Sequence, residues 1–382
     1  MPVIMRDIDW LICCSFLVAL AVSLGSIPII IRVAKMKHLM DMPNGRSVHE
    51  NNIPTLGGIA IFAALVIPVL LFSDFSGNVG INFVIGSVIL LFFIGVKDDI
   101  LVVSPTKKLV FQILAALIVI IVADIRIKSF YGIFGLFEIP FIPSVLFTLF
   151  VYIVIINSFN LIDGIDGLAG GIGFIVALTF GIWFFLSRNA AMATLAVSLA
   201  GALMGFLYFN FSGKRKIFMG DTGSLIIGFI IATLAIKFID LNKLYISEYY
   251  AIKNAPIVAV LVLSTPLFDT LRMVLVRLLS GKSPFHADKN HIHHILLKFR
   301  FSHKESSFML YLFNILIIIL AFTLIQNLSR SASIGVLIVV FLFYFTGALI
   351  LNRWSLALPS ISVSNPIDKK NSEEVTQTHM VN

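Results

Sequence analysis

Eleven long apolar runs constrain this chain more than any other feature. A helix needs about 17–25 apolar residues to cross the hydrocarbon core of a bilayer. The runs lie near residues 9–31, 57–72, 80–96, 109–123, 141–157, 167–186, 190–211, 225–239, 256–280, 308–328 and 334–351. The mean hydropathy is +1.01, and 13% of the residues are charged, whereas soluble domains carry about a quarter. The sequence therefore predicts an all-α, polytopic integral membrane protein with about eleven transmembrane helices.

The two ends of the chain differ in composition. The first apolar run has no small-residue cleavage site, so we expect a retained helix and not a signal peptide. Residues 1–351 are expected to form one transmembrane domain. Residues 352–382 are polar and are expected to form a tail that is disordered at its end. Cys13 and Cys14 are adjacent in the first run and suggest neither a disulfide framework nor a metal site.

The positive charges indicate how the chain is oriented. With loops assigned alternately to two sides, seventeen Lys and Arg residues fall on one side and seven on the other. Because cytoplasmic loops are enriched in these residues, the richer side is predicted to be cytoplasmic. The N-terminus is then outside and the C-terminus inside. The net charge of +8 reflects this topology and does not indicate nucleic-acid binding.

Five loops on the predicted cytoplasmic side carry residues that a simple connector does not need. They are 41-DMPNGRSVHENNIPTLGG-58, 97-KDDILVVSPTKK-108, 157-NSFNLIDGIDGLAGG-171, 212-SGKRKIFMGDTGS-224 and 282-KSPFHADKNHIHH-294. One interpretation is that cytoplasmic loops are simply more polar. The clustering of acids, amides and histidines favours the other interpretation, an active site at the cytoplasmic face.

The acidic residues of these loops admit structural and functional interpretations. Asp98 and Asp99 follow an apolar run, where they could form a solvated helix end, hold a divalent cation or accept a proton. Asp221, Thr222 or Ser224, just before an apolar run, could cap a helix, and Asp221 could instead receive a phosphate that carries Mg²⁺ at a helix N-terminus. Lys214 and its two basic neighbours add positive charge nearby.

The loop after the fifth run is rich in glycine, which is costly in a helix. Asp163 and Asp166 share a face if their segment is helical, as do Asn157 and Asn160. Gly164 and Gly167 lower helix propensity by about 1 kcal/mol each relative to Ala, a cost that is justified where backbone approaches a ligand closely. A glycine-rich turn capped by Asp is the alternative to one wall of a phosphate- or metal-facing cavity.

Two further features stand out near the end of the apolar region. Four of the eight histidines lie within residues 286–294; with no cysteine nearby, hydrogen bonding to phosphate is favoured over zinc. Asp269 lies inside an apolar run, three residues before Arg272. An acid there is a functional candidate, and a satisfied Asp269–Arg272 pair is an equally good interpretation.

Oxygen ligands with flanking cations favour Mg²⁺, which typically binds one or two carboxylates plus substrate phosphates. Two functions follow: an enzyme that moves a phosphoryl group at the membrane edge, or a transporter of a phosphorylated solute. A transporter is expected to place its polar residues near the bilayer midplane in repeated broken helices. Because the polar clusters fall on one face and no repeat is visible, the enzyme is favoured.

In this order, the motifs resemble those of the polyprenyl-phosphate N-acetylhexosamine-1-phosphate transferases, of glycosyltransferase family 4 type. The likeness spans about residues 41–297. It comprises the loop with Arg46, His49, Pro54 and Gly57-Gly58, the Asp98-Asp99 pair, NxxNxxDGxDG at 157–167, FMGDTGSL at 218–225 and DKNHIHHILL at 288–297. The eleven runs and the HIHH form are similar to the branch that uses UDP-N-acetylglucosamine. The branch that transfers phospho-MurNAc-pentapeptide is the alternative.

The resemblance implies a reaction and roles. A phosphate oxygen of undecaprenyl phosphate attacks the sugar-side phosphorus of a UDP-sugar, and UMP leaves, which starts a surface polysaccharide. Asp98 and Asp99 are implied as catalytic, and Asn160 and Asp221 as ligands of Mg²⁺, with Mn²⁺ as an alternative ion. The implied substrate-binding residues are Asn157, Asp163, Asp166, Phe218, His291, His293 and His294.

The resemblance also implies a location, a multi-pass protein of the bacterial inner membrane whose partners are the lipid and the nucleotide sugar. One departure from the family is Val102, where some members have a lysine; Lys107 and Lys108 are the nearest basic residues. The sequence leaves open which UDP-N-acetylhexosamine is used, which pathway is served, and whether the protein is a homodimer.

Overall fold

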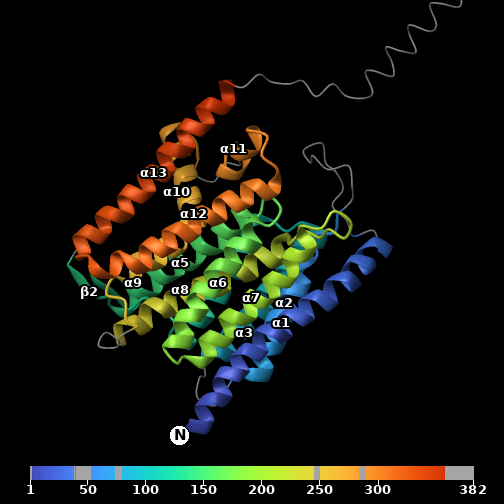
Figure 1. The fold of residues 1–382 in the computed structure, drawn as a ribbon, viewed down its shortest axis with the longest axis horizontal. Coiled ribbons are helices and arrows are strands. Elements are labelled where there is room, and N and C mark those ends of the chain that lie inside the picture. The colour runs from blue at the N-terminus through green and yellow to red at the C-terminus, as the bar shows by residue number, and fades with distance from the viewer. Residues whose placement is uncertain are drawn as a thin grey trace, which may run out of the picture.

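The structure is a computed structural model that describes residues 2–37, 39, 53–73, 80–133, 135–244, 250–283 and 290–357. Arg46, His49 and the tail beyond Ala357 therefore lie outside the described residues, so the expectations about them stay predictions. Within the described ranges the chain is almost entirely helical (Figure 1). This confirms the predicted helical membrane-protein class.

The apolar runs form helices. The elements in the first half are α1 (Pro2–Met36), α2 (Gly57–Phe72), α3 (Gly80–Leu101), α4 (Pro105–Leu117), the π-helical turn η1 (Ile118–Val122), β1 (Ser129–Ile133), β2 (Leu136–Glu138), α5 (Phe141–Ile162) and α6 (Leu168–Leu186). The second half contains α7 (Ala190–Asn210), α8 (Gly220–Leu244), α9 (Ala255–Val262), α10 (Ser264–Leu279), α11 (Ile292–Lys298), α12 (His303–Thr323), the 3₁₀ turn η2 (Ile325–Asn327) and α13 (Arg330–Ala357).

Each predicted apolar run coincides with one of these helices or helix pairs. In the described part of the chain, nine helical segments are long and apolar enough to cross a membrane. The α9–α10 pair forms a tenth candidate that is bent by 82°, and α2 is a shorter apolar helix. The number eleven therefore stays a prediction. The antiparallel β1–β2 hairpin was not predicted.

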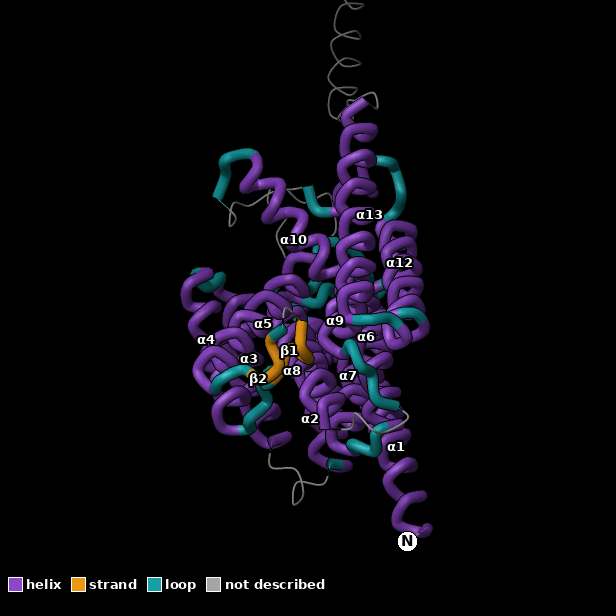
Figure 2. Tube along the Cα trace, turned by 90° about the vertical axis from the view of Figure 1, so that its left-hand side faces the viewer, coloured by secondary structure: helices purple, strands orange, loops and turns teal. Residues whose placement is uncertain are grey.

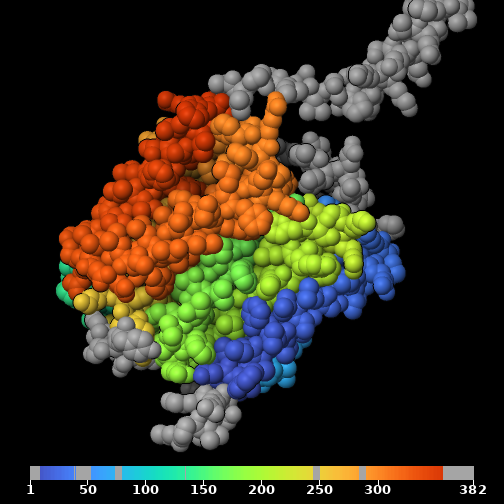
Figure 3. Space-filling model, in the orientation of Figure 1, coloured from blue at the N-terminus to red at the C-terminus, as the bar shows by residue number. Residues whose placement is uncertain are grey.

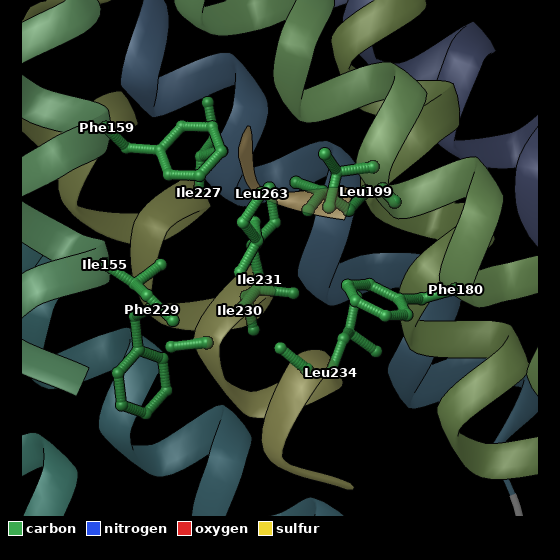
Figure 4. Packing of buried hydrophobic residues seen from close by; sticks show 14 of the residues in the cluster. Ile155, Phe159, Phe180, Leu199, Ile227, Phe229, Ile230, Ile231, Leu234 and Leu263 are labelled. Carbon is green, nitrogen blue, oxygen red and sulfur yellow. The ribbon is translucent and has the colours of Figure 1, made fainter. Parts of the chain in front are cut away.

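Helix α8 is the centre of the bundle. In its most apolar stretch 94% of the residues are buried, compared with 17% in α13. Figure 4 shows Ile227, Ile230 and Leu234 of α8 among aromatic and aliphatic side chains such as Phe159 and Phe180. A helix that is apolar on all sides is expected at such a position. Helix α8 is therefore surrounded by other helices over its apolar length.

The outer helices cover this core. Helix α1 packs on α2 and α7, and α8 packs on α3 and α5. Figures 1 and 3 show α1 along one edge and α13 along the opposite edge, and Figure 2 shows α3 and α4 on the side away from α12 and α13. The large apolar side chains exposed on α1, α12 and α13 are suited to contact lipid.

The sharp bend between α9 and α10 is stabilised by one buried amide. Pro266 lies in the first turn of α10 and disfavours helical backbone before it. Asn314 of α12 accepts a hydrogen bond from the Thr265 N–H and donates one to the Val262 carbonyl, each 3.2 Å long. Backbone groups freed in a membrane must find such partners. The bend re-aims α10, which carries Asp269 and Arg272.

Candidate functional site

The candidate site is built around the N-terminus of α8. Residues 53–58 run alongside the segment before α8, where Phe218 N–H donates to the Pro54 carbonyl and Gly57 N–H donates to the Phe218 carbonyl. A Cβ on Gly58 would lie 2.3 Å from the Gly223 nitrogen, and one on Gly95 would lie 2.5 Å from the Thr222 Cα. Only glycine therefore allows these segments to close so tightly on the first turn of α8.

Asp99 caps α8 from a neighbouring helix. Its carboxylate accepts hydrogen bonds from the N–H groups of Asp221 and Thr222, at 2.7 and 3.2 Å, and from the Thr222 hydroxyl at 2.5 Å. A helix N-terminus offers unsatisfied N–H donors and favours a negative charge. Asp99 therefore positions Asp221, and the prediction that Asp221 might itself be the helix cap is wrong.

Lys108 joins two of the predicted acids. Its ammonium lies 2.7 Å from Asp98 Oδ2 and 2.7 Å from Asp221 Oδ2. The other oxygen of Asp98 accepts the Val103 N–H at 2.5 Å, which holds the α3–α4 loop. Of the two lysines nearest to the acidic pair, Lys107 and Lys108, it is therefore Lys108 that contacts the acids.

The two asparagines of α5 have different environments. Asn160 donates to Asp221 Oδ1 at 2.6 Å and to the Ser224 hydroxyl at 2.9 Å. Asn157 donates instead to Gln112 of α4, at 3.0 Å, and to its own helix. The structure therefore brings Asn160 next to Asp221, whereas Asn157 links α5 to α4.

Asp163 is the acid with the fewest partners. Helix α5 ends at Ile162, and Gly167 has a φ of +80°, so Asp163 and Asp166 do not share a helical face. Among the described residues its carboxylate accepts no hydrogen bond from a side chain or backbone donor. Removal from water, together with the charges of Asp221, Asp99 and Asp166, raises the pKa of Asp163 to about 7.

Asp166 belongs to a second group beside the first. Its Oδ2 lies 2.6 Å from Lys216 and 3.3 Å from His303 Nδ1. Burial alone would raise the pKa of Asp166, but the hydrogen bonds from His303 and Lys216 lower it below its ordinary value. The Lys216 ammonium also lies 5.2 Å from the ring centroid of Phe218. Asp166 thus orients a cation over the aromatic ring of Phe218.

The histidines form a third group, which is linked to the buried acid of α10. His291 Nδ1 lies 2.7 Å from Asp269 Oδ2, and Arg272 donates to Asp269 Oδ1 at 2.8 Å. The interpretation of Asp269 and Arg272 as a satisfied pair is confirmed. His294 lies beside His293, with ring centroids 4.3 Å apart.

His293 connects the histidine group to the glycine-rich loop. A Cβ on Gly164 would lie 2.4 Å from His293 Nε2. The absence of a side chain at position 164 therefore makes room for the His293 imidazole, and close approach of a ligand is not needed to explain this glycine. Burial, followed by the neighbouring His294, lowers the pKa of His293 to about 3. The side chain is 1% exposed, and its Nδ1 has no hydrogen-bond partner among the described residues.

We use the name acidic centre for six residues at the N-terminal end of α8: Asp98, Asp99, Lys108, Asn160, Asp163 and Asp221. It contains four carboxylates and one ammonium, an excess of negative charge. In the described part of the chain no three His, Cys, Asp or Glu side chains form a preformed metal site. Mg²⁺ does not require one, because it is typically held by one or two carboxylates plus substrate phosphates. The partnerless Asp163 and the Asn160–Asp221 pair fit such an ion.

Sequence reasoning missed several residues that shape the site. Asn210 accepts the Gly167 N–H at 2.6 Å and donates to the Ile217 carbonyl at 2.8 Å. Thr222 and Ser224, which the sequence indicated only as helix caps, hold Asp99 and Asn160. Tyr311 of α12 donates to the Gly167 carbonyl at 2.5 Å. A polar residue inside an apolar run, such as Asn210 or Tyr311, is the signal that could have indicated them.

The helical bundle and its charged end define a polytopic membrane protein with a cluster of acidic, basic and histidine side chains at one end. Residues 81–239 match the family model described as glycosyl transferase family 4. The chain is 32% identical over 313 residues to the probable undecaprenyl-phosphate N-acetylglucosaminyl 1-phosphate transferase of Bacillus subtilis (strain 168), which covers 81% of this chain and 84% of the relative.

Two further relatives agree. The decaprenyl-phosphate N-acetylglucosaminephosphotransferase of Mycolicibacterium smegmatis is 32% identical over 291 residues, 71% of each chain. The undecaprenyl-phosphate alpha-N-acetylglucosaminyl 1-phosphate transferase of Escherichia coli (strain K12) is 28% identical over 338 residues, 85% of this chain and 87% of the relative. The chain therefore belongs to glycosyl transferase family 4, and the resemblance found in its motifs is confirmed.

Proposed function

We propose that this protein transfers N-acetylglucosamine 1-phosphate from UDP-N-acetylglucosamine to undecaprenyl phosphate and releases UMP. A lipid phosphate oxygen forms a bond to the sugar-side phosphorus, and the bond from that phosphorus to the UMP oxygen breaks. The observation that carries the proposal is the acidic centre, in which Lys108 bridges Asp98 and Asp221. The names of the relatives support the choice of sugar and lipid.

The chain's own residues suit the task of aligning two anionic substrates. A phosphate monoester is mostly a dianion at pH 7, because its second pKa is about 6, so it needs little help from a general base. Asp98 instead holds Lys108 and the Val103 N–H, and Lys108 supplies positive charge where the attacking phosphate arrives. In phosphoryl transfer, positioning and electrostatic stabilisation provide most of the catalysis.

The opposite wall suits the nucleotide sugar. Phe218 offers a ring for the base, with Lys216 held above it by Asp166. Asn160 and Asp221 are the residues that would hold Mg²⁺, with Asp163 close by. When bound, that ion neutralises phosphate charge and makes UMP a better leaving group. Asp99 keeps Asp221 in place from behind.

A hollow beside the acidic centre suits the lipid. It has a volume of about 300 Å³ and lies between the end of α3 and the start of α4. Apolar side chains such as Phe93 and Leu101 line it together with Lys97 and Lys107. Lysine at a membrane edge can keep its charge at the headgroup level while its stem contacts apolar surface. The hollow therefore offers an approach to Asp98 from the membrane.

The site is proposed to face the cytoplasm, where nucleotide sugars are made, with the N-terminus outside. A cysteine at Ser283 is then expected to be shielded from a membrane-impermeant thiol reagent in intact cells in which Cys13 and Cys14 are replaced. A cysteine at Gln326, at the other end of α12, is expected to react. Labelling at position 283 without labelling at position 326 would show that the site faces the outside.

Isotope exchange tests the reaction directly. Because the chemistry exchanges one pyrophosphate for another of similar energy, it should be reversible. Purified protein with undecaprenyl phosphate, Mg²⁺, UDP-N-acetylglucosamine and radiolabelled UMP is expected to move label into the nucleotide sugar. Omitting the lipid or chelating Mg²⁺ should abolish the exchange. A folded, lipid-supplied protein that exchanges no label with any UDP-N-acetylhexosamine would overturn the proposal.

A further inference from the structure

A buried ion pair in α10 has no part in the chemistry proposed above. Asp269 is 1% exposed and Arg272 is 2% exposed. Taking two charges out of water is costly, and packed apolar residues of similar volume are often as stable. The pair therefore needs an explanation beyond the stability of the bundle, and its contacts provide one.

Both oxygens of the Asp269 carboxylate are directed at residues 290–292. Oδ1 accepts the Ile292 N–H at 3.1 Å in addition to the Arg272 guanidinium, and Oδ2 lies 2.7 Å from His291 Nδ1. Arg272 in turn donates to the Asn290 carbonyl at 2.6 Å. The backbone is thus held on each side of His291, and the imidazole is held by one nitrogen, so its position and its ring orientation are both fixed.

These contacts also determine which imidazole nitrogen carries the proton. Arg272 already compensates the charge of Asp269, so a hydrogen bond from the imidazole N–H is sufficient to satisfy the second carboxylate oxygen. In a neutral imidazole whose Nδ1–H is accepted by a carboxylate, the other nitrogen, Nε2, keeps its lone pair. Nε2 of His291 makes no hydrogen bond to another described residue.

We propose that Asp269 and Arg272 are positioning residues that hold His291 with its Nε2 as a hydrogen-bond acceptor for a hydroxyl or amide N–H of the sugar. The proposal rests on the proposed function and deepens it. It changes the expectation that the histidines bind phosphate oxygens, because an acceptor nitrogen is repelled by a phosphate oxygen. Sugar hydroxyls and the N–H of an acetamido group are donors and suit it.

The neighbouring residues agree with this division of roles. His293 stacks on His291 with ring centroids 5.7 Å apart and an interplanar angle of 11°. Burial lowers the pKa of His293 to about 3, so it brings no positive charge to a phosphate at neutral pH. Two lysines of the described part of the chain that could bind phosphate, Lys108 and Lys216, belong to the other two groups. The histidine group is therefore suited to the uncharged part of the substrate.

The first test concerns the protein alone. In ¹⁵N-histidine-labelled protein, His291, assigned by comparison with His291→Gln, is expected to show a protonated Nδ1 and an unprotonated Nε2 at neutral pH. Asp269→Asn can present an amide N–H to Nδ1 and is expected to shift the proton to Nε2; in a Ser-His-Asp triad such a change of tautomer lowers turnover by about 10⁴-fold. A wild-type protein with the proton on Nε2 would overturn the proposal.

The second test reads the substrate contact. Exchange is compared between UDP-N-acetylglucosamine and analogues that lack one sugar hydroxyl or carry an N-methylated acetamide. The wild type is expected to disfavour one analogue at least tenfold in kcat/KM, and His291→Gln and Asp269→Asn should each reduce that preference. Because both changes remove the same contact, the double variant should be no less selective than His291→Gln.

The control is Asp240→Asn, another buried acid with an i,i+3 basic partner, at the opposite end of α8. It is expected to keep the wild-type preference. If Asp269→Asn fails to fold, the wild-type ¹⁵N spectrum and the substrate preference of His291→Gln still test the proposal. A wild type that exchanges label while His291→Gln keeps every preference would overturn the inference and leave the proposed function standing. Failure of exchange in the wild type would instead defeat the proposed function, and the tautomer would still be read from the spectrum.

Discussion

The two ends of α8 carry similar residues but differ in how their charges are balanced. At the C-terminal end lies a group that we call the far-end cluster: Asp124, Arg126, Lys128, Glu138, Lys237, Asp240 and Lys243. Here three acids face four cations; for example, Lys128 lies 2.9 Å from Asp124 and 3.5 Å from Asp240. The acidic centre contains four acids and one cation, Lys108, whose ammonium lies 2.7 Å from Asp98 and 2.7 Å from Asp221.

This difference separates a structural cluster from a functional one. Both clusters contain buried acids at the end of a membrane-type helix, so burial alone does not distinguish them. Where acids and cations are matched, a cluster holds the hairpin and helices together. Where acids are in excess, their negative charge is not balanced by the protein's own cations and can be balanced by a bound cation. Unbalanced charges of this kind are typical of functional sites. The charge balance therefore supports the proposal that the N-terminal end of α8 is the functional end.

The largest expected effect comes from removing one acid at each end. Asp221→Asn should lower turnover by about 10²–10³-fold, as loss of one key electrostatic group typically does, and should weaken the dependence on Mg²⁺. Asp240→Asn should keep turnover close to the wild type while lowering thermal stability. Label exchange and thermal unfolding of the two purified variants provide the measurement. Similar turnover in both variants would remove the distinction between the two ends.

Removing the single cation of the acidic centre should destabilise the protein. Lys108→Gln leaves Asp98 and Asp221 without their shared partner, and a buried polar group that loses its partner costs about 1–3 kcal/mol. Because a divalent cation can replace the missing charge, added Mg²⁺ should restore much of the lost thermal stability. Lys237→Gln, in the far-end cluster, should show no such recovery. An equal response of both variants to Mg²⁺ would contradict this account.

Substitutions of the two adjacent acids of α3, Asp98 and Asp99, should have different effects on turnover, stability and substrate binding. Asp98→Asn should slow turnover strongly while binding of the UDP-sugar stays closer to normal, because Asp98 lies on the lipid side. Asp99→Asn should lower stability by about 0.5–2 kcal/mol, as loss of a helix cap does, and should also weaken UDP-sugar binding because Asp221 moves. Nucleotide-sugar titration and thermal unfolding distinguish them. Loss of UDP-sugar binding in Asp98→Asn alone would reverse the assignment.

The sequence predicted the convergence of the motifs but not the partners of each residue. Asp98, Asn160 and Asp221 were expected at one face; Lys108 bridges Asp98 and Asp221, and Asn160 donates directly to Asp221. The cap on α8 could not be predicted, because Asp99 and Asp221 are separated by 122 positions and no local pattern links them. Spacing also misled for Asn157, which shares the helix of Asn160 but contacts Gln112. Local periodicity determines a helix face, whereas the neighbour on that face depends on tertiary packing.

A smaller effect is expected where the glycine-rich loop meets the histidines. Gly164→Ala places a Cβ in contact with the His293 ring, so the imidazole must move. We expect a severalfold increase in KM for the UDP-sugar with little change in thermal stability, measured by initial rates of exchange. Gly213→Ala, where a Cβ meets nothing within 4 Å, is the matched control. An unchanged KM would mean that His293 has room to move without loss.

The smallest expected effect is a change of stability with pH. The folded-state pKa of Asp163 is about 7, raised from an ordinary value of 3.8. The corresponding stability is fully present below the ordinary value and is lost as pH rises through about 7. Without Mg²⁺, the thermal stability should therefore fall between about pH 4 and 7 and level off above that range, and Asp163→Asn should reduce this fall. Asp240→Asn should keep it, and a wild-type slope in Asp163→Asn would assign the effect to another group.

The central claim, that the N-terminal end of α8 binds a divalent cation together with the nucleotide, is tested most directly by Mn²⁺ binding. Electron paramagnetic resonance of Mn²⁺ titrated with the purified protein and UDP measures the bound ion without requiring turnover. The wild type and Asp240→Asn are expected to bind Mn²⁺ with similar affinity, and Asp221→Asn is expected to bind it at least tenfold more weakly. Undiminished binding in Asp221→Asn would contradict the claim.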